Sequence, residues 1–362
     1  MTNLSATSSP VLQSFITKAG AQIYRLPLEA FPGFWTYACL IIVDDYVVLV
    51  DCGSGHPDSN KYLETGFEQV SQNEGRPVHF DDLTHILITH GHIDHFGGLV
   101  YLRGRTRAKI GVHELDMQTL SRHEERLALM SRRLLDFLGE AGFPEAERVP
   151  MIQTYKFTKA LYHSVPVDFT YETVGMKIGP FELIHLPGHC PGHVAIRLHD
   201  FVFSGDHLLE GITPHQAPEQ LVQSMGVGHY FDSLSLFERW AEGARLVLGG
   251  HNAPIENLSA CASNIRQQLA LRLHKTLEVL KEPHTIAEVA ACLYSEASGY
   301  FTLLALEKTG AFVEYLYQRN LLEIVNLDEL ESGNQPVAVK YHRLRDVTNS
   351  DILPKEEAYV FV

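Results

Sequence analysis

The chain has 362 residues, of which 45% are hydrophobic and 20% charged, the composition of an ordinary globular protein. Its formal net charge of −15 argues against a protein devoted to non-specific polyanion binding, because phosphate contacts need clustered Lys and Arg side chains. No stretch approaches the roughly 20 apolar residues that span a bilayer, and the polar start up to Gln13 lacks the features of a signal peptide. The five scattered cysteines form no CxxC pair, so we expect a cytoplasmic protein without membrane contact.

The first part of the chain is predicted to form strands and one helix. Asp44 and Asp45 separate two β-rich runs, which is the pattern of a hairpin with a polar turn. The second of these runs ends at Asp51, which a glycine-rich turn follows. In chain order the pattern predicts strands at 22–26, 36–43, 46–50 and 86–88, a helix at 58–73 capped by Asp58 or Ser59, and a helix that begins within 96–102.

Three histidines and an aspartate follow the short strand at 86–88 almost at once. Imidazole and carboxylate groups at this density, on a loop that leaves a strand, suit a divalent transition metal. His90 and His92 lie two residues apart and can point the same way, so we expect them to share an ion. Asp94 and His95 are adjacent and their side chains should diverge, so we expect them to serve a second ion.

Residues 114–165 are predicted to form a mostly helical insert, which either builds the wall or lid of a site or only packs. Around it, strands are predicted at 108–112, 169–174, 176–178, 181–186, 194–198, 201–203 and 245–248. Three of the later strands lead through a glycine to a ligand-type residue: His189, Asp206 and His251. Strands packed side by side bring such loop ends together at one sheet edge, so the sequence predicts one shared site.

Four motifs, HxHxDH at 90–95, PGH at 187–189, SGD at 204–206 and GGH at 249–251, together resemble the metallo-β-lactamase-fold superfamily. The resemblance covers about residues 20–255. It implies an α+β fold, an αββα sandwich in a catalytic domain at 1–257, with two metals at one edge and Asp206 as their bridge. The implied ligands are His90, His92 and His189 for one ion, and Asp94, His95 and His251 for the other.

This ligand set would leave open positions for a bridging water and a substrate oxygen. Two neighbouring cations lower the pKa of such a water, so we expect hydrolysis. In this reaction a metal-bridging hydroxide attacks an ester-like substrate, and Asp94 orients the hydroxide. Imidazoles and carboxylates favour Zn(II), with Fe or Mn as alternatives. Cys190 is not expected to bind, because the side chains of adjacent residues diverge. Flavodiiron relatives have glutamate in place of His92, which favours a hydrolase, whereas a mono-iron persulfide dioxygenase would keep the histidine.

Other polar residues near the motifs have less defined roles. Asp51 resembles the family aspartate that accepts a hydrogen bond from a metal-bound histidine and so fixes its tautomer. His193 and Tyr230 either approach the substrate or are hydrogen-bonded structural residues. Three further histidines are expected to be structural: His56, His207 and His229.

The C-terminal part, 258–362, is predicted to form a winged-helix-like domain. Helices are expected at 257–280, 285–294 and 301–319, the second opened by a capping box, followed by strands at 322–325 and 337–344. This arrangement resembles the lactamase-beta-2-like subgroup. Between Leu258 and Arg345 nine basic and ten acidic residues nearly cancel, so DNA reading is not expected. The module should instead border the active site or form a subunit interface, for example in a homodimer.

The leading hypothesis is therefore a binuclear metal hydrolase that acts on a small molecule such as a thioester, lactone or other small ester. A phosphodiesterase or endoribonuclease on single-stranded RNA is the alternative within hydrolases. It would need a basic channel, and the only local basic cluster comprises Arg103, Arg105, Arg107 and Lys109. A mono-iron persulfide dioxygenase and a regulatory binding module are the alternatives from other classes.

Overall fold

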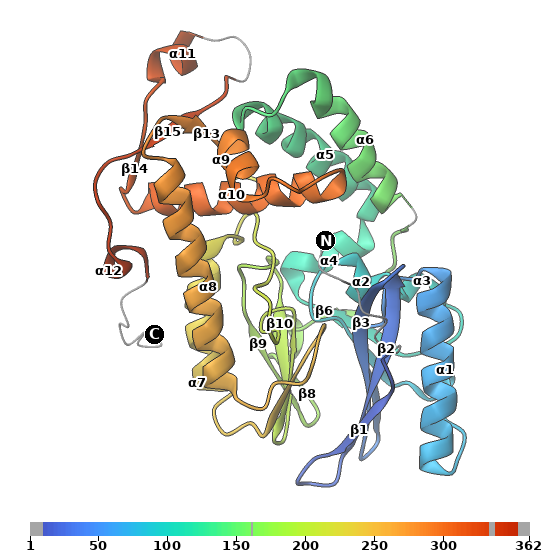
Figure 1. Cartoon of the computed structure of the whole chain (residues 1–362). Coiled ribbons are helices and arrows are strands. Elements are labelled where there is room, and N and C mark those ends of the chain that lie inside the picture. The colour runs from blue at the N-terminus through green and yellow to red at the C-terminus, as the bar shows by residue number, and fades with distance from the viewer. Residues whose placement is uncertain (1–9, 161, 333–336, 354–362) are drawn as a thin grey trace.

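The computed structural model describes residues 10–160, 162–332 and 337–353. Two β-sheets lie face to face, with helices on both outer sides (Figure 1). The predicted αββα sandwich is confirmed. Residues 1–9, where no signal peptide was expected, and residues 354–362 of the predicted C-terminal domain lie outside the described part.

The first sheet contains seven strands in sequence order. It is antiparallel from the first strand to the fourth and parallel from the fourth to the seventh. Side chains alternate across it, because Val48 and Val50 face the second sheet whereas Leu49 faces outward. The strands are β1 (Gln13–Ile16), β2 (Gln22–Phe31), β3 (Phe34–Val43), β4 (Tyr46–Val50), β5 (His85–Leu87), β6 (Lys109–Val112) and β7 (Phe169–Thr170).

The second sheet has the strand order β12-β11-β10-β9-β8. Its outermost pair, β11 and β12, is parallel, and the other pairs are antiparallel. The strand expected at 169–174 stops at Thr170, and a 3-10 turn at Glu172–Val174 follows it. The strands are β8 (Lys177–Ile178), β9 (Phe181–His185), β10 (Val194–Leu198), β11 (Phe201–Gly205) and β12 (Leu246–Gly249).

Each outer face of the sandwich is covered by helices that pack on the sheets. Helix α1 (Pro57–Glu74) packs on the first sheet through Leu63, Phe67 and Val70. Its cap is His56, not Asp58 or Ser59, because Pro57 takes the first helical position that its fixed φ favours. Helices α7 (Val227–Trp240) and α8 (Leu258–Val279) cover the second sheet (Figure 1). The sequence pattern did not predict α7.

The insert is mostly helical, as α4 (Glu114–Ser121), α5 (His123–Glu140) and α6 (Glu145–Lys159). Helix α6 had no recognisable pattern, because Ile152 is its only fully buried residue and Pro150 interrupts it. The helix expected from Phe96 is two short helices, α2 (Ile93–Phe96) and α3 (Leu99–Leu102). A 3-10 turn at Phe80–Asp82 precedes β5.

The C-terminal part packs against the sandwich and the insert (Figure 1). The capping box predicted for the second helix is present, with Thr285 and Glu288 bonded reciprocally. The winged-helix domain, with its boundary at 258, stays a prediction. No helix among the described residues is long and apolar enough to cross a membrane. The elements are β13 (His284–Thr285), α9 (Ile286–Leu293), α10 (Tyr300–Gln318), β14 (Leu322–Ile324), α11 (Leu327–Ser332), β15 (Lys340–Arg343) and α12 (Asn349–Ile352), and β13, β15 and β14 form a third sheet.

The contact between Gly98 and the turn after β4 allows a direct test of this packing. A Cβ atom at Gly98 would lie 2.1 Å from the carbonyl oxygen of Cys52, which is backbone and cannot rotate away. We expect Gly98→Ala to lower the free energy of unfolding by about 1–3 kcal/mol, as overpacking does. Denaturant unfolding measures this. Gly228→Ala is the control, because its Cβ would meet nothing closer than 3.8 Å. An equal loss of unfolding free energy in both variants would contradict the tight contact between Gly98 and Cys52.

Candidate metal centre

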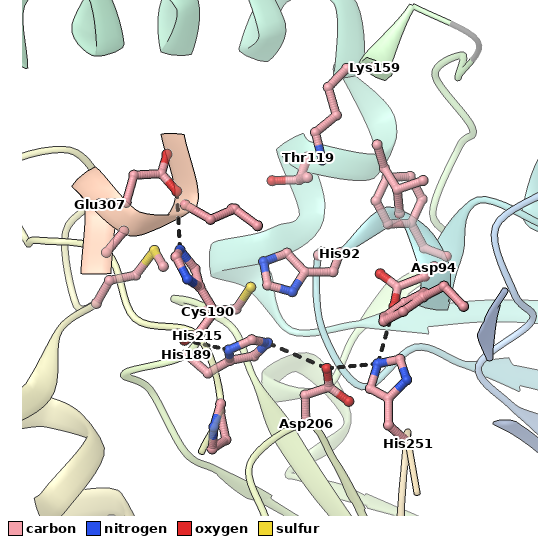
Figure 2. Close-up of a pocket in the computed structure, with 18 of the residues that line it drawn as sticks. His92, Asp94, Thr119, Lys159, His189, Cys190, Asp206, His215, His251 and Glu307 are labelled. Carbon is pink, nitrogen blue, oxygen red and sulfur yellow. Dashed lines mark hydrogen bonds and ion pairs between the residues drawn. The ribbon is translucent and has the colours of Figure 1, made fainter. Parts of the chain in front are cut away.

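Four strand ends deliver polar side chains to the same edge of the sandwich. The loop after β5 carries His90 and His92, and the loop after β9 carries His189. Asp206 directly follows β11, and His251 follows β12. Because β11 and β12 are parallel, their carboxyl ends lie at one edge, where the side chains meet (Figure 2).

The ligand atoms of these residues fall into three overlapping groups, each with all atoms within 4.8 Å of one another. Two of these groups contain the two ligand sets that the sequence resemblance implies. The third group contains Asp206 with one histidine from each set, which is the position that a bridging carboxylate would take. The groups are His90, His92, His189 and Cys190; Asp94, His95 and His251; and His90, His95 and Asp206.

The carboxylate of Asp206 lies at the centre of the cluster. Its Oδ2 is 3.2 Å from Nε2 of His251 and 3.8 Å from Nε2 of His189 (Figure 2). Its Oδ1 is 3.4 Å from Nε2 of His95. Gly250 permits this approach, because a Cβ there would lie 2.5 Å from Oδ1 of Asp206. One carboxylate therefore contacts histidines from both predicted sets.

Adjacent ligand-type residues converge in two places where divergence was expected. Asp94 Oδ2 lies 3.5 Å from Nε2 of His95 and 3.2 Å from Nε2 of His251, because the first turn of α2 directs both side chains toward the cluster. Asp94 and His95 do share a group, as predicted. The sulfur of Cys190 lies within the group of His90, contrary to the expectation that it points away from His189. Burial raises the pKa of this thiol well above its ordinary value.

Asp51 lies where the sequence predicts a supporting carboxylate. Its Oδ2 accepts hydrogen bonds from Nδ1 of His95, at 2.8 Å, and from the Thr89 hydroxyl, while its Oδ1 accepts from the Thr89 backbone N–H. Asp51 has a φ of 57°, a left-handed conformation that aspartate tolerates. The contact fixes the proton of His95 on Nδ1 and leaves Nε2 facing the cluster.

Charges within the cluster balance one another. Burial opposes protonation of His95, but the carboxylates of Asp206, Asp94 and Asp51 outweigh it and raise the pKa of His95 well above its usual value. Burial also opposes ionisation of Asp206, yet His251 and His95 hold its pKa well below the ordinary range. This part of the cluster favours the charged form of both partners.

The His90 end of the cluster behaves oppositely. Burial, together with the neighbouring imidazoles of His95, His92 and His193, lowers the pKa of His90 well below its ordinary value. Burial and Asp206 act in opposite directions on His189, with a net lowering of its pKa to about 4. These rings are neutral near pH 7, and a neutral imidazole offers a lone pair to a metal.

The cluster fits divalent metal by its buried atoms that lack a hydrogen bond as well as by its residue types. Within the described part of the chain, three buried atoms that face the centre make no hydrogen bond: Nε2 of His95, Nε2 of His189 and Oδ1 of Asp206. Buried polar atoms without a hydrogen bond are rare because they carry a desolvation penalty. Imidazole nitrogens and carboxylate oxygens are also ligands that Zn(II), Fe and Mn accept.

Two predicted catalytic residues have other contacts. His193 is fully buried, and its Nε2 accepts the backbone N–H of Asp206 at 3.0 Å, so it contacts the chain that carries Asp206 and does not line the cavity. Tyr230 is also buried away from the cavity, and its hydroxyl donates to the carbonyl oxygen of His207. The three histidines expected to be structural also have contacts away from the cluster. His56 caps α1, His207 is buried in the core, and His229 contacts Glu219.

A buried arginine that the sequence analysis did not single out holds the loop of His251. Arg25 on β2 is fully buried and donates through Nη2 to the carbonyl oxygens of Gly249, at 2.9 Å, and Asn252, at 2.8 Å. The Trp35 carbonyl accepts from Nδ1 of His251 at 2.7 Å. The only sequence signal for Arg25 was a charged residue at an inward position of an alternating strand.

A second residue that was missed, Asp116 on α4, joins two of the ligand-bearing loops. Its Oδ2 accepts the backbone N–H of Gly91 at 2.8 Å, and its Oδ1 accepts the N–H of Gly192 at 3.1 Å. Burial raises the pKa of Asp116 to about 6, against the lowering effect of these two amides. An aspartate in the first turn of a helix is too common to signal this role.

The C-terminal helix α10 reaches the cluster through one histidine. Nδ1 of His189 donates to the backbone carbonyl of His215 at 2.7 Å, and Nε2 of His215 lies 3.1 Å from the carboxylate of Glu307 on α10 (Figure 2). Glu314, further along the same helix, accepts the N–H of Glu219 in the same loop. The prediction that the C-terminal part borders the site agrees with these contacts.

A cavity of about 750 Å³ opens over the cluster. Asp94, His92 and Asp206 form its base. Its walls are mostly apolar and come from the β2–β3 hairpin, the insert, the loop after Asp206 and α10, with Phe34, Trp35, Leu127, Met130, Ile212 and Leu304 among the lining residues. A cavity of this size holds a small molecule. The basic residues of 103–109 do not line it.

The family model described as the metallo-beta-lactamase superfamily matches residues 33–254. The chain is 26% identical over 132 residues to a hydroxyacylglutathione hydrolase of Haemophilus influenzae, covering 35% of this chain and 50% of that protein. It is 27% identical over 180 residues to a probable metallo-hydrolase of Bacillus subtilis, covering 48% and 66%. The chain thus matches half to two thirds of the length of these curated relatives.

Two solved structures resemble most of the chain. A metallo-beta-lactamase family protein from Thermus thermophilus has a TM-score of 0.68 at 24% identity and is covered to 98%, with 89% of this chain aligned. A beta-lactamase domain protein from Burkholderia ambifaria has a TM-score of 0.66 at 20% identity, with 91% of this chain and 94% of that one covered. At these identities the likeness shows the fold.

The two hydrogen bonds of Asp116 generate a prediction about metal binding. Asn at this position has only one acceptor oxygen, so one of the two loop N–H groups loses its partner. Because ligand-supporting hydrogen bonds are worth about 10–100-fold in metal affinity, we expect Asp116→Asn to weaken zinc binding about tenfold. A chelator competition titration measures it. Asp136→Asn, on the exposed face of α5, is the control; unchanged affinity in both variants would contradict the role of Asp116.

Proposed function

Because the chain belongs to the metallo-beta-lactamase superfamily, we propose that it is a metal-dependent hydrolase of a small ester-like molecule, with a thioester as the preferred class. One observation carries the proposal: two groups of ligand atoms meet at Asp206 at the base of a small, mostly apolar cavity. The hydrolase names of both curated relatives support the reaction type, and the hydroxyacylglutathione hydrolase supports a thioester.

The residues that would hold the metal are those of the two predicted sets. His90, His92 and His189 would hold one ion, Asp94, His95 and His251 the other, and Asp206 both. When bound, a pair of divalent ions supplies a water of lowered pKa and a Lewis acid for the substrate carbonyl. Zn(II) suits the donor set, with Fe or Mn as alternatives.

The protein side chains have three tasks in this reaction. Asp94 lies at the base of the cavity and is close to His95 and His251, so its carboxylate can orient a water and accept a proton. Asp51 and the Trp35 carbonyl hold the rings of His95 and His251 in one orientation. The apolar walls exclude bulk water and so strengthen electrostatic interactions with the bound ester.

The form of the cavity favours a small ester over single-stranded RNA. An RNA substrate needs a basic channel that follows several phosphates. Arg103, Arg105 and Arg107 lie before β6, whereas the cluster lies at the opposite, carboxyl end of the parallel strands. The predicted basic cluster is therefore not available to a substrate at the base of the cavity.

Metal content tests the ligand assignment. Protein purified without added metal should contain close to two metal ions per chain, chiefly zinc, and Asp206→Ala should lose metal and turnover because both ions share this carboxylate. Elemental analysis by mass spectrometry measures the content. Asp136→Ala is the control. One iron per chain, with oxygen uptake on a persulfide, would instead establish the dioxygenase alternative.

A hydrolysis panel tests the substrate class. Metal-loaded protein should cleave thioesters with a higher kcat/KM than lactones, oxygen esters, phosphodiesters or single-stranded RNA. The Asp206→Ala protein is the blank for contaminating esterases. Preferred cleavage of RNA or of a phosphodiester would overturn the thioester assignment and leave the metal site intact.

A further inference from the structure

Two basic side chains line the cavity and form no ion pair with any described residue. Arg126 on α5 and Lys159 at the end of α6 both belong to the wall of the cavity, and both are partly buried. Across the described residues, neither side chain forms an ion pair or a hydrogen bond. Arg266, by comparison, is also partly buried and pairs with Glu238 at 2.5 Å.

Lys159 faces the space above the cluster, and Arg126 belongs to the same wall. Figure 2 shows Lys159 extending from its helix into the cavity, with its ammonium group toward Thr119 and His92. Burial raises the pKa of Tyr155 to about 12, and Lys159 and Arg126 both act against that shift, so the two cations lie near the same hydroxyl. They therefore form one positive region of the wall.

The acidic residues beside this region have other hydrogen-bond partners. Asp116, on which Arg126 acts electrostatically, accepts the backbone N–H groups of Gly91 and Gly192. Glu307 on α10 also acts on Tyr155, but its carboxylate lies 3.1 Å from Nε2 of His215, across the cavity from Lys159 in Figure 2. The remaining wall next to the cations is apolar and includes Leu127, Met130 and Leu304. Within the described structure neither cation forms an ion pair, although Arg126 acts electrostatically on the buried carboxylate of Asp116.

Partly buried cations without partners are unfavourable unless a ligand compensates them. The protein as a whole has 44 acidic and 29 basic residues, which repel an anionic molecule at long range. A local pair of cations beside the cluster would offset this repulsion. Guanidinium and ammonium groups bind carboxylates and phosphates through charge-assisted hydrogen bonds.

We propose that the cavity selects ester-type substrates that carry an anionic group, a carboxylate or a phosphate, which Lys159 and Arg126 bind while the apolar wall holds the rest. This inference rests on the proposed function, because it places the ester at the base of the cavity. It assigns substrate selection to the helical insert, and Lys159 and Arg126 are binding residues.

Binding of unreactive thioethers tests the inference without turnover. The probes are S-pentyl-3-mercaptopropionate, its neutral amide and S-pentyl-2-mercaptoethyl phosphate, titrated calorimetrically into zinc-loaded protein. We expect at least one anionic probe to bind about tenfold more tightly than the amide, which corresponds to about 1.4 kcal/mol. Comparing the carboxylate with the phosphate identifies the preferred anion.

Variants of the insert show whether the two cations cause the preference. Lys159→Gln and Arg126→Gln should each reduce the ratio of anion to amide affinity several-fold, whereas Lys159→Arg should retain most of it. Lys156→Gln, on the exposed side of the same helix, is the matched control and should keep the full ratio. Thermal unfolding of each variant confirms that it is folded.

Four outcomes overturn or separate the two proposals. Equal affinity for the anionic probes and the amide would overturn the inference. A preference for the anion that persists in the Lys159→Gln/Arg126→Gln double variant would also overturn it, because the metal would then bind the anion. Hydrolysis of neutral and anionic thioesters with equal kcat/KM would overturn it while the proposed function stands. A Lys159-dependent preference in a protein that cleaves no thioester would support the inference and overturn the thioester assignment.

Discussion

The cluster depends on the mutual compensation of buried carboxylates and imidazoles. Asp206 lies among histidines from three different loops, and Asp51 lies behind His95, so each buried charge has an opposite one beside it. A carboxylate buried alone would become protonated or would destabilise the fold. The sheets bring the strand ends together, and this balance of charge allows the ends to stay close.

Much of the fold and the cluster was predictable because both depend on local patterns. Alternating β-branched runs indicated nearly all strands of the sandwich, and glycine followed by a ligand-type residue marked the ends that meet at the site. Helix α7 was missed, and α6 lacked periodicity because only Ile152 is fully buried. The convergence of Asp94 with His95 could not be derived from spacing, since it depends on the first turn of α2.

The supporting residues were beyond sequence reasoning for a different physical reason. Arg25, Asp116 and Glu307 act through contacts with chain segments that are distant in sequence, and their own sequence surroundings are ordinary. Arg25 bonds to the carbonyl of Gly249, 224 residues away. Such contacts are fixed only when the sheets are packed, so no periodicity or motif reports them.

The link made by Asp116 has a consequence for the evolution of this insert. The carboxylate ties α4 to the loop of His92 and to the loop of His189, whereas α5 and α6 contribute wall residues and, within the described structure, no such bond. The insert is thus divided into a part that the metal site constrains and a part free to diverge. Exchange of α5 and α6 would therefore change the wall of the cavity and leave the hydrogen bonds from α4 to the two ligand-bearing loops in place. The boundary between inherited chemistry and variable specificity would lie near Arg122, where α4 ends.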